Sequence, residues 1–93
     1  MPRFRKKPII IEAFHLTEEA RWDNRDWLEW MHRAWNGRIP EPGSMAPGLE
    51  GSLLIYTSEG TLSAKIGDWI LQGTQGEIST CKDDIFQKLY EQV

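Results

Sequence analysis

Four charged residues and one cysteine gather around expected turns in the C-terminal third of the chain, and their types could do acid–base or nucleophilic chemistry. Asp68, Glu77 and Asp84 are carboxylates, which in pairs can share a proton or hold a divalent cation. Cys81 precedes Lys82, and a neighbouring cation lowers the pKa of a thiol. Each residue also has a structural explanation, because acids favour turns and caps. We therefore favour a binding surface over a catalytic site at these five positions.

Tryptophan is the second residue type that could carry a function. Trp69 follows Asp68 in an expected strand, where its ring could stack on a base or ligand or pack in the core. Trp22 lies almost opposite the apolar stripe of an expected helix, and Trp30 lies at the edge of that stripe. An exposed tryptophan there would be an interface anchor, since tryptophan is enriched at binding hot spots. All three residues are candidates for contact with a partner or ligand.

Common cofactor and metal motifs are absent from the sequence. There is no glycine-rich phosphate loop, no HExxH and no GxSxG. The two histidines, His15 and His32, lack the spacing of a metal-binding pair, and a single cysteine excludes both an internal disulfide and a cysteine-based zinc site. We expect no metal and no cofactor, and we favour a non-enzymatic role.

The charge of the chain is unevenly distributed. Its 93 residues, 40% of them hydrophobic, suit a single domain over residues 1–93 with its own core. The net charge is −3, yet Arg3, Arg5, Lys6 and Lys7 all precede Pro8, and the remaining chain carries 7 basic and 14 acidic residues. The basic segment could contact nucleic acid phosphates or could be a solvated terminus that protects a sheet edge. The acidic remainder disfavours a duplex.

No apolar run approaches the length of a membrane-spanning helix. The apolar stretch after the basic segment ends at Glu12, which is too short for a signal peptide. We therefore expect a cytoplasmic protein that does not contact membranes.

Hydrophobic patterning predicts an α+β fold, with one amphipathic helix packed on a curled antiparallel sheet of five to six strands, either a meander or a small open barrel. Three consecutive isoleucines favour a strand over residues 8–15. Residues 17–35 contain no glycine or proline and place Trp27, Met31 and Ala34 on one helical stripe. Two starts for this helix compete, Thr17 and Asp23.

The second half of the chain is predicted to be mostly β-structure. Residues 36–52 contain four glycines and three prolines, which indicates a connector. Turn residues then separate short apolar stretches, as in hairpins. We expect strands at 53–57, 61–65, 69–72 and 77–81, a helical turn over 85–89 capped by Asp83 or Asp84, and a last short strand at 89–93.

The turn-rich C-terminal part resembles a widespread group of small phage and prophage proteins. The resemblance is carried by Gly67-Asp-Trp-Ile70, Gly73-x-x-Gly76-Glu77, Cys81-Lys82-x-Asp84-Ile85-Phe86 and Tyr90-Glu91, with the N-terminal basic residues, Pro8, Glu12-Ala13, Glu59-Gly60 and Ala64. Ile66 and Asp83 stand where the group usually has proline, and Ser79-Thr80 where it often has Tyr-Pro. These changes loosen the turns but keep the glycine and aromatic framework.

The resemblance covers residues 2–17 and 53–93 and implies a phage-encoded accessory protein in an infected or lysogenic bacterium. It supplies no active site. We expect a non-enzymatic binding module that occludes a host protein or sequesters a small ligand. The alternative is nucleic-acid binding through the basic segment and an aromatic sheet face. Two further hypotheses are a small hydrolase using Cys81 or the carboxylates, and a homo-oligomer that buries spare tryptophans and sheet edges.

Overall fold

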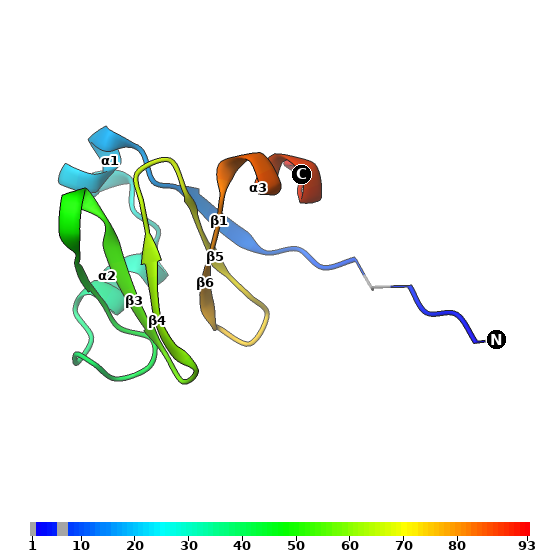
Figure 1. Ribbon diagram of the computed structural model, residues 1–93, viewed down its shortest axis with the longest axis horizontal. Helices are drawn as coiled ribbons and strands as arrows, with labels where there is room; N and C mark the ends of the chain where they lie inside the picture. The colour runs from blue at the N-terminus through cyan, green and yellow to red at the C-terminus, as the bar shows by residue number, and fades with distance from the viewer. Residues whose placement is uncertain (1, 6–7) are drawn as a thin grey trace.

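Two open three-stranded antiparallel sheets and three α-helices make up the part of the chain that the computed structural model describes, residues 2–5 and 8–93 (Figure 1). The α+β class predicted from the sequence is confirmed, and the number of strands lies in the predicted range of five to six. The strands form two open sheets rather than one, and the sheets do not close into a barrel. Sheet A has the order β1-β5-β6 and sheet B the order β2-β3-β4. The strands are β1 (Glu12–His15), β2 (Met45–Pro47), β3 (Leu53–Thr57), β4 (Gly60–Ala64), β5 (Trp69–Gln72) and β6 (Ile78–Cys81). The helices are α1 (Glu18–Trp22), α2 (Glu29–Trp35) and α3 (Asp83–Leu89).

The two hairpins follow the sequence prediction to within one residue at each end. Strands β3 and β4 pair from Leu53 opposite Ala64 to Thr57 opposite Gly60. Gly60 has a φ of 139°, a conformation that side chains other than glycine rarely adopt, which explains the glycine at this turn. Strands β5 and β6 pair around the turn that follows Gln72.

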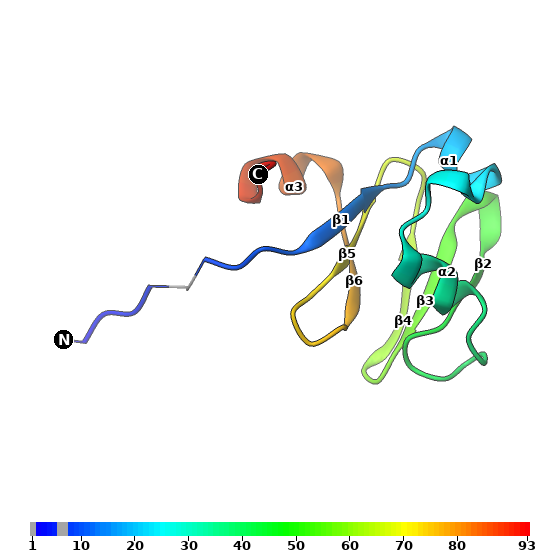
Figure 2. The same cartoon turned by 180° about the vertical axis from the view of Figure 1, so that it is seen from behind.

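The first strand is shorter than the predicted strand over residues 8–15, because its partner ends. Glu12 pairs with Gln72, the last residue of β5, and the chain then turns, with the Gly73 amide donating to the Glu77 carbonyl at 2.9 Å. Residues 8–11 therefore have no strand beside them. They continue β1 away from the body of the molecule, as Figures 1 and 2 show.

The predicted helix over residues 17–35 is interrupted. Thr17 caps α1 by accepting from the Ala20 amide at 3.1 Å. Asp23 then ends α1 in an extended conformation, because its carboxylate accepts from the Arg25 amide at 3.1 Å and so starts a 3₁₀ turn over Asn24–Asp26. Leu28 is extended and precedes α2. Thr17 thus starts α1 and Asp23 starts the 3₁₀ turn, whereas α2 begins only after Leu28.

The ends of the remaining elements also differ from expectation. The connector over residues 36–52 contains β2 and a 3₁₀ turn over Leu49–Gly51. At the C-terminus, Lys82 is the N-cap residue of α3 and makes no side-chain cap, whereas Asp83 and Asp84 lie in the first turn. The expected strand over residues 89–93 does not form, because α3 continues to Leu89.

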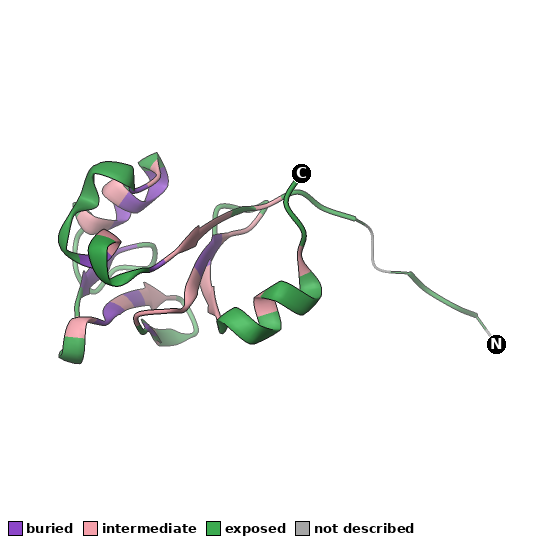
Figure 3. Ribbon diagram, turned by 90° about the horizontal axis from the view of Figure 1, so that it is seen from above, coloured by how far each residue is buried: buried purple, intermediate pink, exposed green. Residues whose placement is uncertain are grey.

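The core lies between the two sheets and α2, which packs against β2 (Figure 2). Its largest fully buried apolar side chains come from α2, β2, β3, β5 and the residue after β1, and Figure 3 shows the buried positions gathered in the body of the molecule. They are Leu16, Met31, Met45, Leu53, Ile55 and Ile70. One face of sheet A supplies Ile70 to this core, which leaves its other face to carry α3. Within the described residues, no helix is long and apolar enough to cross a membrane.

Candidate functional site

Four aromatic rings stack in a row on the face of sheet A that points away from the core. His15 of β1 lies opposite Trp69 of β5, so both side chains leave the same face, and their rings are stacked with centroids 4.6 Å apart. Phe86 of α3 covers the other side of Trp69 at 3.9 Å, and Tyr90 stacks on Phe86 at 5.0 Å. The spacing of Phe86 and Tyr90 by four residues places them on one side of α3. We call these four residues the aromatic stack.

Polar contacts hold the aromatic stack in place. The indole Nε1 of Trp69 donates to Oδ1 of Asp83 at 2.8 Å, and Gln87 Nε2 donates to the same oxygen at 3.2 Å. These hydrogen bonds hold the pKa of Asp83 below its usual value, and the one from Trp69 has the larger effect. The Asp83 carboxylate is therefore charged at neutral pH. His15 Nε2 donates to the Gly67 carbonyl at 3.0 Å, which sets the plane of the imidazole ring.

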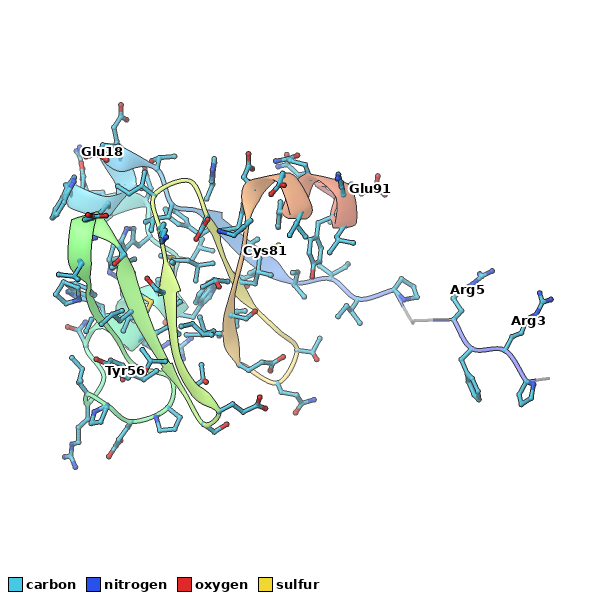
Figure 4. All side chains as sticks on the ribbon, in the orientation of Figure 1. Arg3, Arg5, Glu18, Tyr56, Cys81 and Glu91 are labelled. Carbon is cyan, nitrogen blue, oxygen red and sulfur yellow. The ribbon has the colours of Figure 1, made fainter. Side chains whose placement is uncertain are left out.

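A groove of about 360 Å³ lies between the aromatic stack, the chain that follows α3 and the segment before β1. Its lining is mostly apolar: one wall is aromatic and the opposite wall is formed by isoleucines. The lining residues are Ile9, Ile10, Ile11, Ala13, Trp69, Phe86, Tyr90, Glu91, Gln92 and Val93. We call it the α3 groove. Figure 4 shows Glu91, its one charged lining residue, at the end of α3.

Among the predicted site residues, Asp68 and Glu77 make contacts within turns. Asp68 accepts from the Lys65 amide through Oδ2 at 2.9 Å, and its carbonyl accepts from the Leu16 amide at 2.9 Å. The Glu77 carboxylate lies directly over Gly73, where any side chain would collide with it. Both residues are thus explained by local structure. Within the described residues, no cluster of three or more histidine, cysteine or acidic side chains could hold a metal ion.

Cys81, Lys82 and Asp84 lie at the junction of β6 and α3. The Lys82 carbonyl accepts from the Phe86 amide at 2.8 Å, and Asp84 is exposed in the first turn of α3. Cys81 is half-buried beside them, and Figure 4 labels its position. Burial, followed by the charges of Asp84 and Asp68, raises the pKa of the Cys81 thiol. The thiol therefore stays protonated at neutral pH, and the geometry gives a nucleophilic role no support.

The two candidate anchors in the helical region differ. Trp22 is 66% exposed, and its indole Nε1 donates to Glu18 at 3.2 Å. Trp30 is only 5% exposed and donates to Glu12 Oε1 at 3.1 Å. Trp30 is therefore a core residue and not an exposed anchor, because the break before Leu28 turns the first residues of α2 toward sheet A.

The aromatic stack and its hydrogen-bond partner Asp83 include residues to which sequence reasoning gave no function. The sequence gives His15 no metal-binding partner, names Phe86 only within the resemblance and places Asp83 in a helix cap. The pair Phe86 and Tyr90, spaced for one helix face, was the signal in the sequence that could have indicated an aromatic surface. Arg3 and Arg5 lie far from the groove on the extended segment (Figure 4). Lys6 and Lys7 lie outside the described residues.

No protein-family model matches this chain, and no curated protein and no solved structure matches it either.

Proposed function

We propose that this protein is a phage- or prophage-encoded accessory protein that acts as a non-enzymatic binding module on a host protein, with the α3 groove as its recognition site. The observation that carries the proposal is a mostly apolar groove with a stacked aromatic wall. The resemblance to small phage proteins supports the biological setting, and it falls on the same residues, Trp69, Phe86 and Tyr90.

The groove suits an apolar side chain presented by a target protein. Burying one leucine-sized side chain contributes about 1.5–3 kcal/mol. The Trp69 ring is already held by His15, Phe86 and Asp83, so this wall loses little conformational freedom on binding. Glu91 at the groove favours a basic residue next to the apolar one in the target.

The same geometry favours protein binding over nucleic-acid binding. A base needs a free aromatic face, but both faces of Trp69 are covered, by His15 and by Phe86. The basic residues Arg3 and Arg5 are exposed and remain the basis of the nucleic-acid alternative. In that case, Arg3, Arg5, Lys6 and Lys7 changed together to alanine would abolish a gel shift at low salt.

Affinity capture from a bacterial host lysate on the immobilised full chain tests the proposal. We expect one host protein to be retained by the native chain, and its affinity to fall by about tenfold, or about 1.4 kcal/mol, in Tyr90→Ala. Leu49→Ala is the control, because it removes an exposed apolar side chain that does not line the groove. Retention that ignores Tyr90→Ala, or a metabolite screen that alone yields a ligand, would contradict a host-protein target. Appearance of the transcript on prophage induction tests the phage setting.

A further inference from the structure

Residues 8–11 have the sequence of a strand and lack a strand partner. Three consecutive β-branched isoleucines favour the extended conformation. Among the described residues, no backbone hydrogen bond involves this segment. Ile9 and Ile10 are 52% and 78% exposed. An extended, apolar segment with unpaired amides and carbonyls is a template for pairing with another strand.

Among the described residues, no strand pairs with this segment, and residues 90–93, which lie across the α3 groove from it, make no backbone hydrogen bond to it. Strand β5 is already paired on both sides, by β1 and by β6, and it ends opposite Glu12. Strand β1 is an edge of sheet A, and residues 8–11 prolong that edge into solvent. A partner strand must therefore come from another molecule.

The charge distribution indicates which molecule supplies the partner strand. The four basic residues before Pro8 carry no compensating acid among themselves, whereas the rest of the chain has 7 basic and 14 acidic residues. Arg3 and Arg5 lie away from the acidic body of the molecule (Figure 4), which reaches 48 Å in its longest dimension against 26 Å in the next. A second copy offers both a matching apolar strand and an acidic surface for the basic segment.

We infer that two copies of this chain pair antiparallel through residues 8–11 and the exposed edge of β1, about a two-fold axis perpendicular to the sheet. The arrangement is isologous and closed, so it forms a dimer rather than a fibre. It joins the two copies of sheet A into one continuous sheet and brings the basic segment of each copy toward Glu12 of the other. The segment also lines the α3 groove through Ile9, Ile10 and Ile11, so the dimer and the proposed host-protein contact share one wall. The two are tested separately, because the mass of the purified chain reports the dimer alone and Tyr90→Ala changes only the groove.

Light scattering coupled to size exclusion tests the stoichiometry. We expect the native chain at about 100 µM to show twice the monomer mass of 10.8 kDa. Ile10→Lys places like charges near the two-fold axis and should weaken association by about tenfold or more. Leu49→Lys is the matched control, because Leu49 is 87% exposed on a distant 3₁₀ turn. A native chain that stays monomeric, or a dimer that Ile10→Lys leaves intact, overturns the inference.

Cysteine cross-linking tests the symmetry. A two-fold axis perpendicular to an antiparallel pair places one residue of the segment opposite its own copy, within disulfide reach. In a Cys81→Ser background, we expect one of I9C, I10C and I11C to form a covalent dimer rapidly under mild oxidation, and L49C to remain monomeric. Far-ultraviolet circular dichroism of the cross-linked chain should show added β-structure. Equal and slow cross-linking at all four positions contradicts the pairing.

Discussion

At the scale of single residues, Asp83 links sheet A to the helix that carries the groove wall. Its carboxylate accepts hydrogen bonds from Trp69 of β5 and from Gln87 of α3. A carboxylate bonded in this way binds its donors more strongly when charged than when protonated. The position of Phe86 on Trp69 therefore depends on the ionisation of one exposed side chain.

Acid should loosen this link, and Asp83→Asn should remove the effect. The folded-state pKa of Asp83 lies below its unfolded value of about 4, so its contribution to stability is complete above that value and is lost as the pH falls through the folded pKa. In Asp83→Asn, the free energy of unfolding should be lower at pH 7 and should depend less on pH below about 4. Denaturant unfolding followed by tryptophan fluorescence measures both changes.

Asp84→Asn is the control, because it removes a neighbouring carboxylate that makes no hydrogen bond to Trp69. Identical pH profiles for the two variants would contradict the role of Asp83.

At the scale of elements, the sequence predicts those parts of the fold that local chemistry decides. The hairpins are predicted to within a residue because Gly60 and the glycines around residues 73–76 define their turns. The interruption of the predicted helix over residues 17–35 is not predicted by the helical pattern, because it arises where the Arg25 amide donates to the Asp23 carboxylate and ends α1. The aromatic stack depends on a contact between β5 and α3, which no spacing along the chain reveals.

The two tryptophans at the breaks of this helical region should differ sharply in their effect on stability. Trp30→Ala empties a buried site between α2 and sheet A and leaves Glu12 without its indole donor, so we expect a loss of about 3–5 kcal/mol. Trp22→Ala removes an exposed ring that covers the guanidinium of Arg21, and it should cost about 1 kcal/mol or less. Urea unfolding of the two variants gives the comparison. Similar losses would mean that Trp30 is not part of the core.

At the scale of the whole molecule, the separation of charge between the first eight residues and the rest favours one relative orientation of two copies in the dimer that we infer. A chain of net charge −3 with evenly mixed charges would repel its copies weakly at every approach. In the dimer that we infer, an antiparallel approach brings the basic residues of one copy toward the acidic body of the other before the apolar segments pair. Both the affinity of the dimer and its response to salt therefore depend on these four residues.

Replacing Arg3, Arg5, Lys6 and Lys7 with glutamine should reverse the salt dependence of dimerisation. The native dimer should dissociate more readily as salt rises, because the Debye length shrinks to about 10 Å at 0.1 M and screens the attraction. The variant lacks four of the 11 basic residues, so its copies should repel, associate about tenfold more weakly at low salt and gain affinity as salt is added. Sedimentation equilibrium between about 20 and 500 mM salt measures the slope.

The double variant Lys65→Gln with Lys88→Gln is the control, because it removes two exposed basic residues from the body, and it should keep the native sign of the slope. A variant whose affinity still falls with salt would show that the basic segment does not face the acidic body of the second copy.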